Sequence, residues 1–98
     1  MKININQVKN TIDQHMVFFR DTYNVKDIGV FGSVASGQNT EKSDIDLLVE
    51  FSKPIGFFKF IQLEKYLSKI LRRNVDLVTK KALKSAIKDE VLREVVYV

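Results

Sequence analysis

Apolar residues recur along the chain with two different periods, and these periods predict the helices and the strands. Three segments have apolar residues at spacings of three and four, which is typical of amphipathic helices: 7–23, 57–73 and 80–94. Three shorter apolar runs, bounded by turn residues, predict strands: 26–31, 44–51 and 74–79. Between the first two strands, residues 35–43 are small and polar, so we expect a loop or one helical turn there.

The apolar stripe of each predicted helix gives its expected inward face. In the first helix this face is Val8, Ile12, His15, Phe19 and Tyr23. In the second it is Phe57, Phe60, Ile61, Glu64, Leu67, Ile70 and Leu71. In the third it is Leu83, Ala86, Ile87, Val91 and Leu92. We expect Asn6 to cap the start of the first helix and Asn24 to close it in a left-handed conformation.

The order of these elements, α-β-β-α-β-α, predicts an α/β (α+β) fold. Residues 1–98 are enough for one domain, and a small mixed sheet with helices mainly on one face is the expected arrangement. A helix separates the second and third strands, which indicates a crossover to a parallel neighbour. The order of the strands in the sheet does not follow from the sequence.

Composition excludes several classes of protein. Hydrophobic residues make up 45% and charged residues 29% of the chain, as in globular proteins. The lack of cysteine excludes disulfides and thiolate metal sites and fits a reducing cytoplasm, where we expect the protein to act. The N-terminus has no signal-peptide pattern, and no apolar run approaches the ~20 residues that span a membrane. The net charge of +4 is spread over the chain and by itself does not indicate a partner. We expect no direct binding of nucleic acid.

Two aspartates in the second predicted strand are the first candidates for chemistry. Asp44 and Asp46 are two residues apart, so both are expected on the same face of that strand. Their charges repel, and an arrangement of this kind is stable when a cation such as Mg²⁺ lies between them. The alternative is that Asp44 caps a loop while Asp46 faces solvent at a strand edge.

Two further features strengthen the first interpretation. Gly32-Ser33 directly follows a strand, and glycine allows a phosphate to approach the backbone while the serine hydroxyl donates to it. An ordinary turn is the alternative there. Asp76 adds a third carboxylate in the middle of an apolar strand, where an unpaired charge is costly. Three carboxylates beside such a turn suit phosphoryl chemistry with two metal ions.

The spacing of these residues resembles a family signature. Gly32-Ser33, ten intervening residues and then Asp44-Ile45-Asp46 are similar to the GS-x₁₀-D-x-D signature of the DNA polymerase β nucleotidyltransferase superfamily. The surrounding sequence VFGSVASGQNTEKSDIDLLVEF and the C-terminal segment from Asn74 resemble the minimal nucleotidyltransferase branch. This resemblance covers residues 25–98.

The resemblance implies a role for each candidate residue. Asp44 and Asp46 would ligate Mg²⁺, with two ions expected when nucleotide is bound. Asp76 would complete the metal site and act as the general base. Gly32 and Ser33 would hold the phosphates of the nucleotide. Many relatives carry an arginine where this chain has Ser36; its absence leaves the carboxylates in place but predicts a lower catalytic rate, and nucleotide binding without turnover is the alternative.

The resemblance also implies a partner. Members of this branch are commonly antitoxins of HEPN-domain toxins, which are ribonucleases, and are expected to transfer AMP from ATP to a tyrosine of the toxin. The alternatives are an antitoxin that acts by binding alone, and a subunit of a nucleotidyltransferase for small molecules or RNA ends. Because the chain has little beyond a catalytic core, a partner or another subunit is expected to complete the site, as a homo- or hetero-oligomer. The apolar segment 91–98 either docks that partner or packs on the chain's own sheet.

Overall fold

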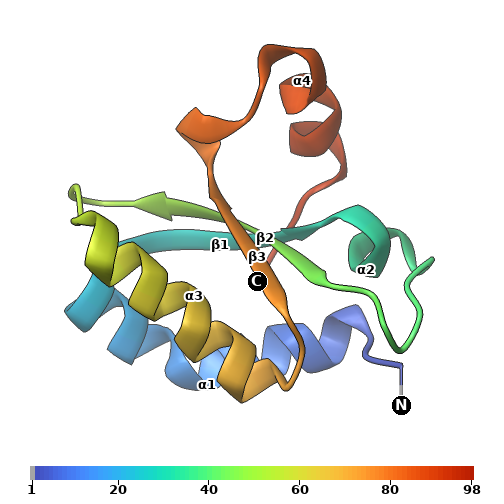
Figure 1. Cartoon of the computed structure of the whole chain (residues 1–98), viewed down its shortest axis with the longest axis horizontal. Helices are drawn as coiled ribbons and strands as arrows, with labels where there is room; N and C mark the ends of the chain where they lie inside the picture. Colours follow the sequence, from blue (N-terminus) through green and yellow to red (C-terminus); the bar gives the residue numbers. More distant parts are fainter. Residues whose placement is uncertain (1) are drawn as a thin grey trace.

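Helices α1 (Ile5–Tyr23) and α3 (Phe57–Leu71) lie side by side on one face of a four-stranded sheet in this computed structural model, which describes residues 2–98 (Figure 1). The remaining elements follow in chain order: β1 (Val25–Phe31), α2 (Gly32–Ser36), β2 (Ile45–Phe51), β3 (Val75–Thr79), the 3₁₀ helix η1 (Lys80–Ala82), α4 (Ser85–Glu94) and β4 (Val96–Tyr97). We call the face of the sheet away from α1 and α3 the open face.

The strand order β3-β2-β1-β4 makes the sheet mixed. β1 pairs antiparallel with both β2 and β4, whereas β2 and β3 are parallel and joined through α3. The predicted fold class and the predicted parallel crossover are therefore confirmed. The short helix α2 and the strand β4 are additions to the predicted order of elements.

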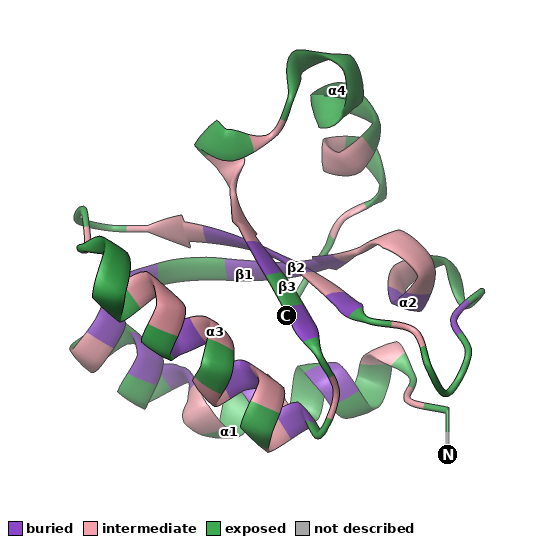
Figure 2. Cartoon of the chain, viewed as in Figure 1, coloured by how far each residue is buried: buried purple, intermediate pink, exposed green. Residues whose placement is uncertain are grey.

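The hydrophobic core lies between the sheet and the two helices α1 and α3 (Figure 2). Side chains of β1, β2 and β3 alternate between this core and the open face, as the two-residue period of a strand requires. On α1 four of the five expected inward residues are buried. Met16 takes the fifth place, whereas His15 is only half-buried and its ring contacts Phe19 and Tyr66.

The start of α1 lies two residues before the predicted one. Asn4, not Asn6, is the N-cap: its side chain accepts a hydrogen bond from the Gln7 amide at 2.9 Å. The Gln7 side chain accepts one from the Asn4 amide at 2.8 Å, which completes a capping box. Asn24 closes the helix in the left-handed conformation, with φ of 54°, as predicted.

The predicted inward face of α3 is confirmed at Leu67 and Leu71 but not at its first residue, Phe57. A row of leucines four residues apart, Leu63, Leu67 and Leu71, is buried. Phe57 is 72% exposed because it lies in the first turn of the helix and lines a surface groove instead of the core. The helix ends at Leu71, since Arg72 adopts a left-handed conformation with φ of 55°.

Polar side chains of α3 reach the backbone of β3, which is an edge strand. The Leu77 amide donates to Glu64 Oε2 at 2.9 Å, and the Val75 amide donates to Ser68 Oγ at 3.1 Å. Glu64, expected on the inward face, is half-buried for this reason. These two bonds fix the strand that carries Asp76 to the helix that precedes it.

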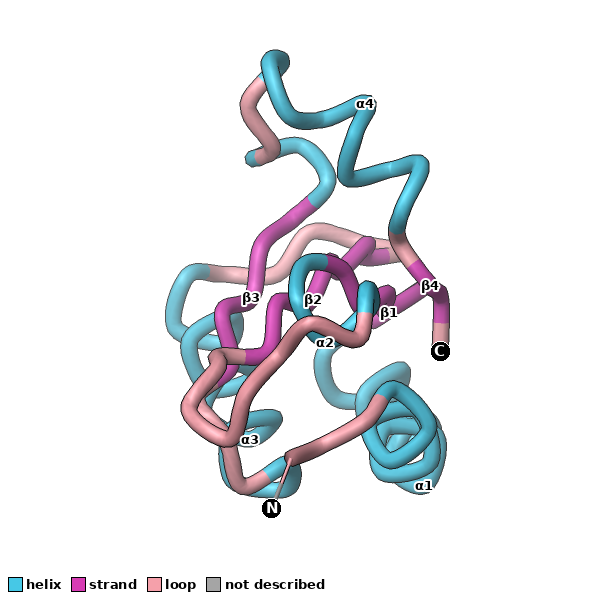
Figure 3. The backbone as a smooth tube through the Cα atoms, turned by 90° about the vertical axis from the view of Figure 1, so that its right-hand side faces the viewer, coloured by secondary structure: helices cyan, strands magenta, loops and turns pink. Residues whose placement is uncertain are grey.

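The predicted third helix, 80–94, is in fact two helices. The Ala82 amide donates to Thr79 Oγ1 and starts η1, and an extended link at Leu83 and Lys84 then separates η1 from α4. No residue of α4 is buried, and Ile87 is 46% exposed, so the predicted inward face is wrong. The helix stands away from the core, beyond the open face, in both views (Figures 1 and 3).

The C-terminal segment packs on the chain's own sheet. β4 pairs with Gly29 and Val30 of β1, and the Val98 amide donates to the Ile28 carbonyl at 2.9 Å. The side chain of Val95 fills the space beside Gly29, where a Cβ would collide with it. Among residues 2–98 no helix is both long and apolar enough to cross a membrane.

The two sides of α3 make a direct test of this packing. Leu67→Ala should lower the free energy of unfolding by about 2–5 kcal/mol, because it leaves a cavity in the core. Phe57→Ala should change it by no more than about 0.5 kcal/mol, because that ring is mostly in solvent. Urea unfolding of the two variants measures both values, and equal losses would show that the leucine row is not the packed face.

Candidate functional site

The parallel pairing of β2 and β3 brings two of the predicted carboxylates together. Asp46 and Asp76 are direct register partners on strands that lie about 4.8 Å apart, so their side chains project from the open face next to each other. Asp46 is half-buried and Asp76 is exposed. Residues 30 positions apart in the sequence are thus neighbours, as the predicted site requires.

Asp44 lies just before the first residue of β2, at the end of a fixed loop. The Ile45 amide donates to the Asn74 carbonyl at 2.9 Å, which joins the starts of β2 and β3. Thr40 and Ser43 close the preceding turn, since the Thr40 amide donates to Ser43 Oγ at 2.8 Å. Asp44 is exposed and lies at the same end of the sheet as Asp46 and Asp76.

Gly32 forms the other wall of the site. It stands where β1 turns into α2, one residue after Phe31, which pairs with Asp46. Its φ is +72°, a conformation that side chains disfavour, and a Cβ at this position would collide with the carboxylate of Asp46. Glycine is therefore required twice, by the turn and by the close approach of Asp46.

Ser33 follows in the first turn of α2 and is half-buried. Its carbonyl accepts from the Gln38 amide at 2.9 Å and closes the short helix. Within residues 2–98 its hydroxyl has no hydrogen-bond partner, and no side chain caps the start of α2. The hydroxyl and the first amides of this helix are therefore free to donate to an anion beside Asp46.

The electrostatics of the site concentrate on Asp46. Burial raises the pKa of this carboxyl above its ordinary value of 3.8, and the charges of Asp76 and then Asp44 raise it further. The folded chain is destabilised by this gathering of negative charge. A cation among the three side chains would relieve it.

The donor set fits Mg²⁺, which prefers oxygen ligands and binds through one or two carboxylates together with substrate phosphates. In the part of the chain that the structure describes, no three histidine, aspartate or glutamate side chains are arranged to hold an ion together. Asp46 with either neighbour would supply the protein share of such a site, and the phosphates would supply the rest.

Two contacts that hold the loop beside this site could not be predicted from the sequence pattern. Asn39 is buried, and its side-chain amide donates to the Ile3 carbonyl at 2.8 Å. Lys2 Nζ donates to the Gly37 carbonyl, at the end of α2, at 3.1 Å. A polar residue in a polar loop predicts solvent exposure, so its burial against the N-terminal segment appears only in the fold.

Comparison with known proteins identifies the family. The model of the nucleotidyltransferase domain matches residues 12–98, a range that contains all five predicted site residues. The chain belongs to the nucleotidyltransferase domain family. The resemblance predicted from the sequence is thereby confirmed.

Relatives of this nucleotidyltransferase domain support the assignment. The protein adenylyltransferase MntA of Thermococcus cleftensis is 44% identical over 96 residues, which cover 98% of this chain and 97% of the relative. A solved structure of a protein assigned as a minimal nucleotidyltransferase has a TM-score of 0.81 at 28% identity, covering 96% of this chain and 95% of the other.

A more distant solved structure shows the same fold. It is a complex of a tri-AMPylated HEPN toxin with an MNT antitoxin from Shewanella oneidensis, with a TM-score of 0.65 at 20% identity. The match covers 92% of this chain and 70% of the other.

The raised pKa of Asp46 predicts how the stability of the free protein depends on pH. The folded chain keeps the Asp46 proton to a higher pH than the unfolded chain does, so this residue makes stability fall as pH rises above about 3.8. Asp46→Asn removes the titration. With EDTA present, the Tm of the variant should equal that of the wild type at lower pH and exceed it increasingly as pH rises, until Asp46 is fully ionised.

Asp13→Asn, at an exposed position of α1, is the control and should follow the wild type at every pH. Differential scanning calorimetry over a pH series measures all three proteins. If the Tm of Asp46→Asn stays below that of the wild type at neutral pH, the repulsion among the aspartates is not the dominant interaction at this site.

Proposed function

We propose that this nucleotidyltransferase domain uses Mg²⁺ and ATP to transfer AMP to a tyrosine of a HEPN-domain toxin and acts as the antitoxin of that toxin. The observation that carries the proposal is the half-buried Asp46, between Asp76 and Asp44 and in contact with the backbone of Gly32. The 44% identical relative is a protein adenylyltransferase, and a neighbour with the same fold is an antitoxin in complex with a tri-AMPylated HEPN toxin.

Each predicted site residue has a part in this reaction. Asp44 and Asp46 hold Mg²⁺, two ions being proposed when ATP is bound, and Asp76 completes the set. When bound, Mg²⁺ would neutralise part of the negative charge on the phosphates. The Gly32 backbone and the Ser33 amide and hydroxyl donate to phosphate oxygens and fix the triphosphate over the open face. Asp76, the most exposed strand carboxylate of the site, takes the proton from the attacking tyrosine hydroxyl.

The acceptor must come from a partner that docks beside these residues. The nucleotidyltransferase domain takes up residues 12–98, so in this proposal the chain provides the nucleotide site and the partner provides the acceptor. Docking places the acceptor hydroxyl next to the α-phosphorus and makes the attack effectively unimolecular. The new bond joins the tyrosine oxygen to that phosphorus, and pyrophosphate leaves.

An antitoxin that acts by binding alone is the second candidate. It is favoured by the observation that, within residues 2–98, no three acidic or histidine side chains are arranged to hold an ion together. Ser36 adds to it, because this exposed, small and neutral side chain at the end of α2 stands where the family resemblance leads us to expect an arginine. Transfer of label from ATP separates the two candidates.

Asp76→Asn tests the division of roles among the carboxylates. If Asp76 is the base, the variant should lose transfer by at least about a hundredfold while it still binds ATP with Mg²⁺. Isothermal titration calorimetry with Mg²⁺, and again with EDTA, measures the binding. A loss of binding as large as that of Asp46→Asn would make Asp76 chiefly a metal ligand, and a variant with full activity would remove it from the mechanism.

Transfer to the partner is tested with a HEPN-domain toxin, which we expect to be encoded by the neighbouring gene. Purified toxin, mixed with this protein, Mg²⁺ and ATP, should gain about 329 Da per modification, the mass of AMP less water, as expected for nucleotidyl transfer. Intact-mass spectrometry measures the gain, and peptide mapping should place it on a tyrosine.

The double variant Asp44→Asn, Asp46→Asn is the control for this experiment. It should give no mass increase and should still bind the toxin, because both side chains lie at the metal site. If the wild-type protein silences the toxin without modifying it, the binding-only antitoxin is correct. If the two proteins do not associate, the antitoxin role fails. A neighbouring gene that encodes a different enzyme subunit would then favour a nucleotidyltransferase for small molecules or RNA.

A further inference from the structure

A groove of about 800 Å³ lies at the ends of β2 and β3 that are farther from Asp46 and Asp76. It is bounded by the loop after β2, the first turn of α3, the start of η1 and α4. Its apolar lining includes Pro54, Ile55 and Phe57, and the Phe57 ring is 72% exposed. A large aromatic side chain left in solvent beside a groove marks a surface suited to binding.

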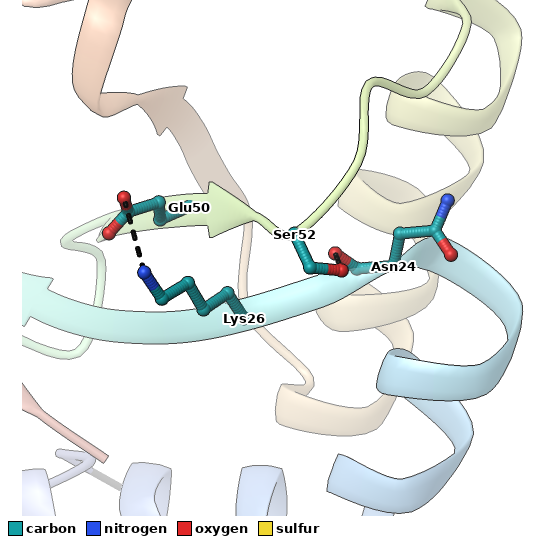
Figure 4. Close-up of polar contacts among 4 residues, drawn as sticks. All are labelled: Asn24, Lys26, Glu50 and Ser52. Atoms are coloured by element: carbon teal, nitrogen blue, oxygen red, sulfur yellow. Dashed lines mark hydrogen bonds and ion pairs between the residues drawn. The ribbon is translucent and has the colours of Figure 1, made fainter.

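The groove is also strongly basic. Four lysines line it: Lys53, Lys80, Lys81 and Lys88. Within residues 2–98 none of the four lysine side chains has a hydrogen bond or an ion pair. The acid in the lining, Glu50, is engaged from the other side by Lys26 at 3.9 Å (Figure 4). The positive charge of the groove is therefore not compensated by the chain.

The groove lies within reach of the nucleotide site along a single strand. Asp46 and Glu50 are four residues apart on β2, so their side chains project from the same face of the strand, at positions about 13 Å apart along it. A polypeptide held in the groove would have residues within a few positions of the carboxylates. This is the position that an acceptor protein must occupy.

We propose that this groove docks an acidic segment of the acceptor protein that also carries an apolar side chain. The proposal rests on the proposed function, which requires a protein acceptor beside Asp46. Unpaired lysines attract acidic side chains, and Phe57 and Ile55 provide the apolar contact. The same charges would attract RNA, but Phe51 and Phe60 pack edge to face with centroids 6.3 Å apart, so these two rings do not present parallel faces to successive bases. RNA binding is therefore tested as a competing outcome.

The basic part of the groove is tested without ATP or metal. The probe is a fluorescently labelled random copolymer of glutamate and tyrosine in a 4:1 ratio, and anisotropy measures its Kd. The variant Lys81→Glu, Lys88→Glu should bind it about tenfold more weakly, because each reversal turns an attraction into a repulsion. Both side chains are exposed, and Lys88 lies in the first half of α4, where a glutamate suits the helix dipole.

The matched control changes the net charge equally at positions outside the groove. The variant Lys9→Glu, Lys65→Glu changes exposed residues of α1 and α3. It should raise the Kd of the copolymer by no more than about twofold, since charges farther away than about 10 Å are screened at 0.1 M salt. Equal weakening by both double variants would overturn the proposal, because it would show attraction by net charge alone. A wild-type protein that does not bind the copolymer would overturn it as well.

The apolar part has its own pair of variants on adjacent residues. Phe57 lines the groove and Phe58 does not, although Phe58 is even more exposed, at 82%. Phe57→Ser should raise the Kd of the copolymer about threefold or more, and Phe58→Ser should leave this Kd nearly unchanged. Equal effects would remove Phe57 from the binding surface. Displacement of the copolymer by polyuridylate at lower concentrations than by unlabelled copolymer would make the groove a nucleic-acid site and overturn the proposal.

The toxin assay then separates this inference from the proposed function. With the toxin as acceptor, Lys81→Glu, Lys88→Glu should raise the KM for toxin about tenfold and leave kcat at saturation unchanged. If the toxin is modified with the same KM by the wild type and this variant, the groove proposal fails and the proposed function stands. If the copolymer binds as predicted but the toxin is never modified, the transfer reaction fails and the groove remains a docking site.

Discussion

Repulsion among carboxylates held on neighbouring strands is the constraint on which the site depends. The parallel register sets Asp46 beside Asp76, and the fixed start of β2 brings Asp44 to the same end. Burial, and then the charges of Asp76 and Asp44, raise the pKa of Asp46, so the folded chain is less stable with this carboxyl ionised than it would be without that charge. Such an arrangement indicates that binding, and not stability, determines which residues stand there.

Sequence patterns predicted those features that depend on neighbouring residues. The strand period placed Asp46 on the face opposite Leu47, and the glycine at the strand-to-helix turn was recognised from its context. The contact between Gly32 and the Asp46 carboxylate was not predictable, because it depends on the register of β1 against β2. Sequence also missed the burial of Asn39, whose partner at Ile3 is 36 residues away.

The failure at α4 has a different physical cause. Helical periodicity in residues 80–94 was interpreted as an inward face, but periodicity reports only that one side of a helix is more apolar than the other. With α1 and α3 already covering the core face of the sheet, α4 lies beyond the open face and keeps Ile87 in solvent. Its position there encloses one side of the basic groove, since Lys88 is part of the lining. The position of α4 away from the core therefore explains why the predicted inward face is wrong, and it also forms one side of the groove that we propose as a docking surface.

The hydrogen bonds from α3 to β3 have a consequence for how this protein associates with others. An edge strand normally offers its outward amides to a strand from another chain, which leads to sheet extension or aggregation. Here Glu64 and Ser68 already occupy the amides of Leu77 and Val75. A partner strand would have to displace a carboxylate and a hydroxyl to pair there. Strand addition along Val75–Leu77 is thus disfavoured, and a partner on that side would bind more readily through side chains.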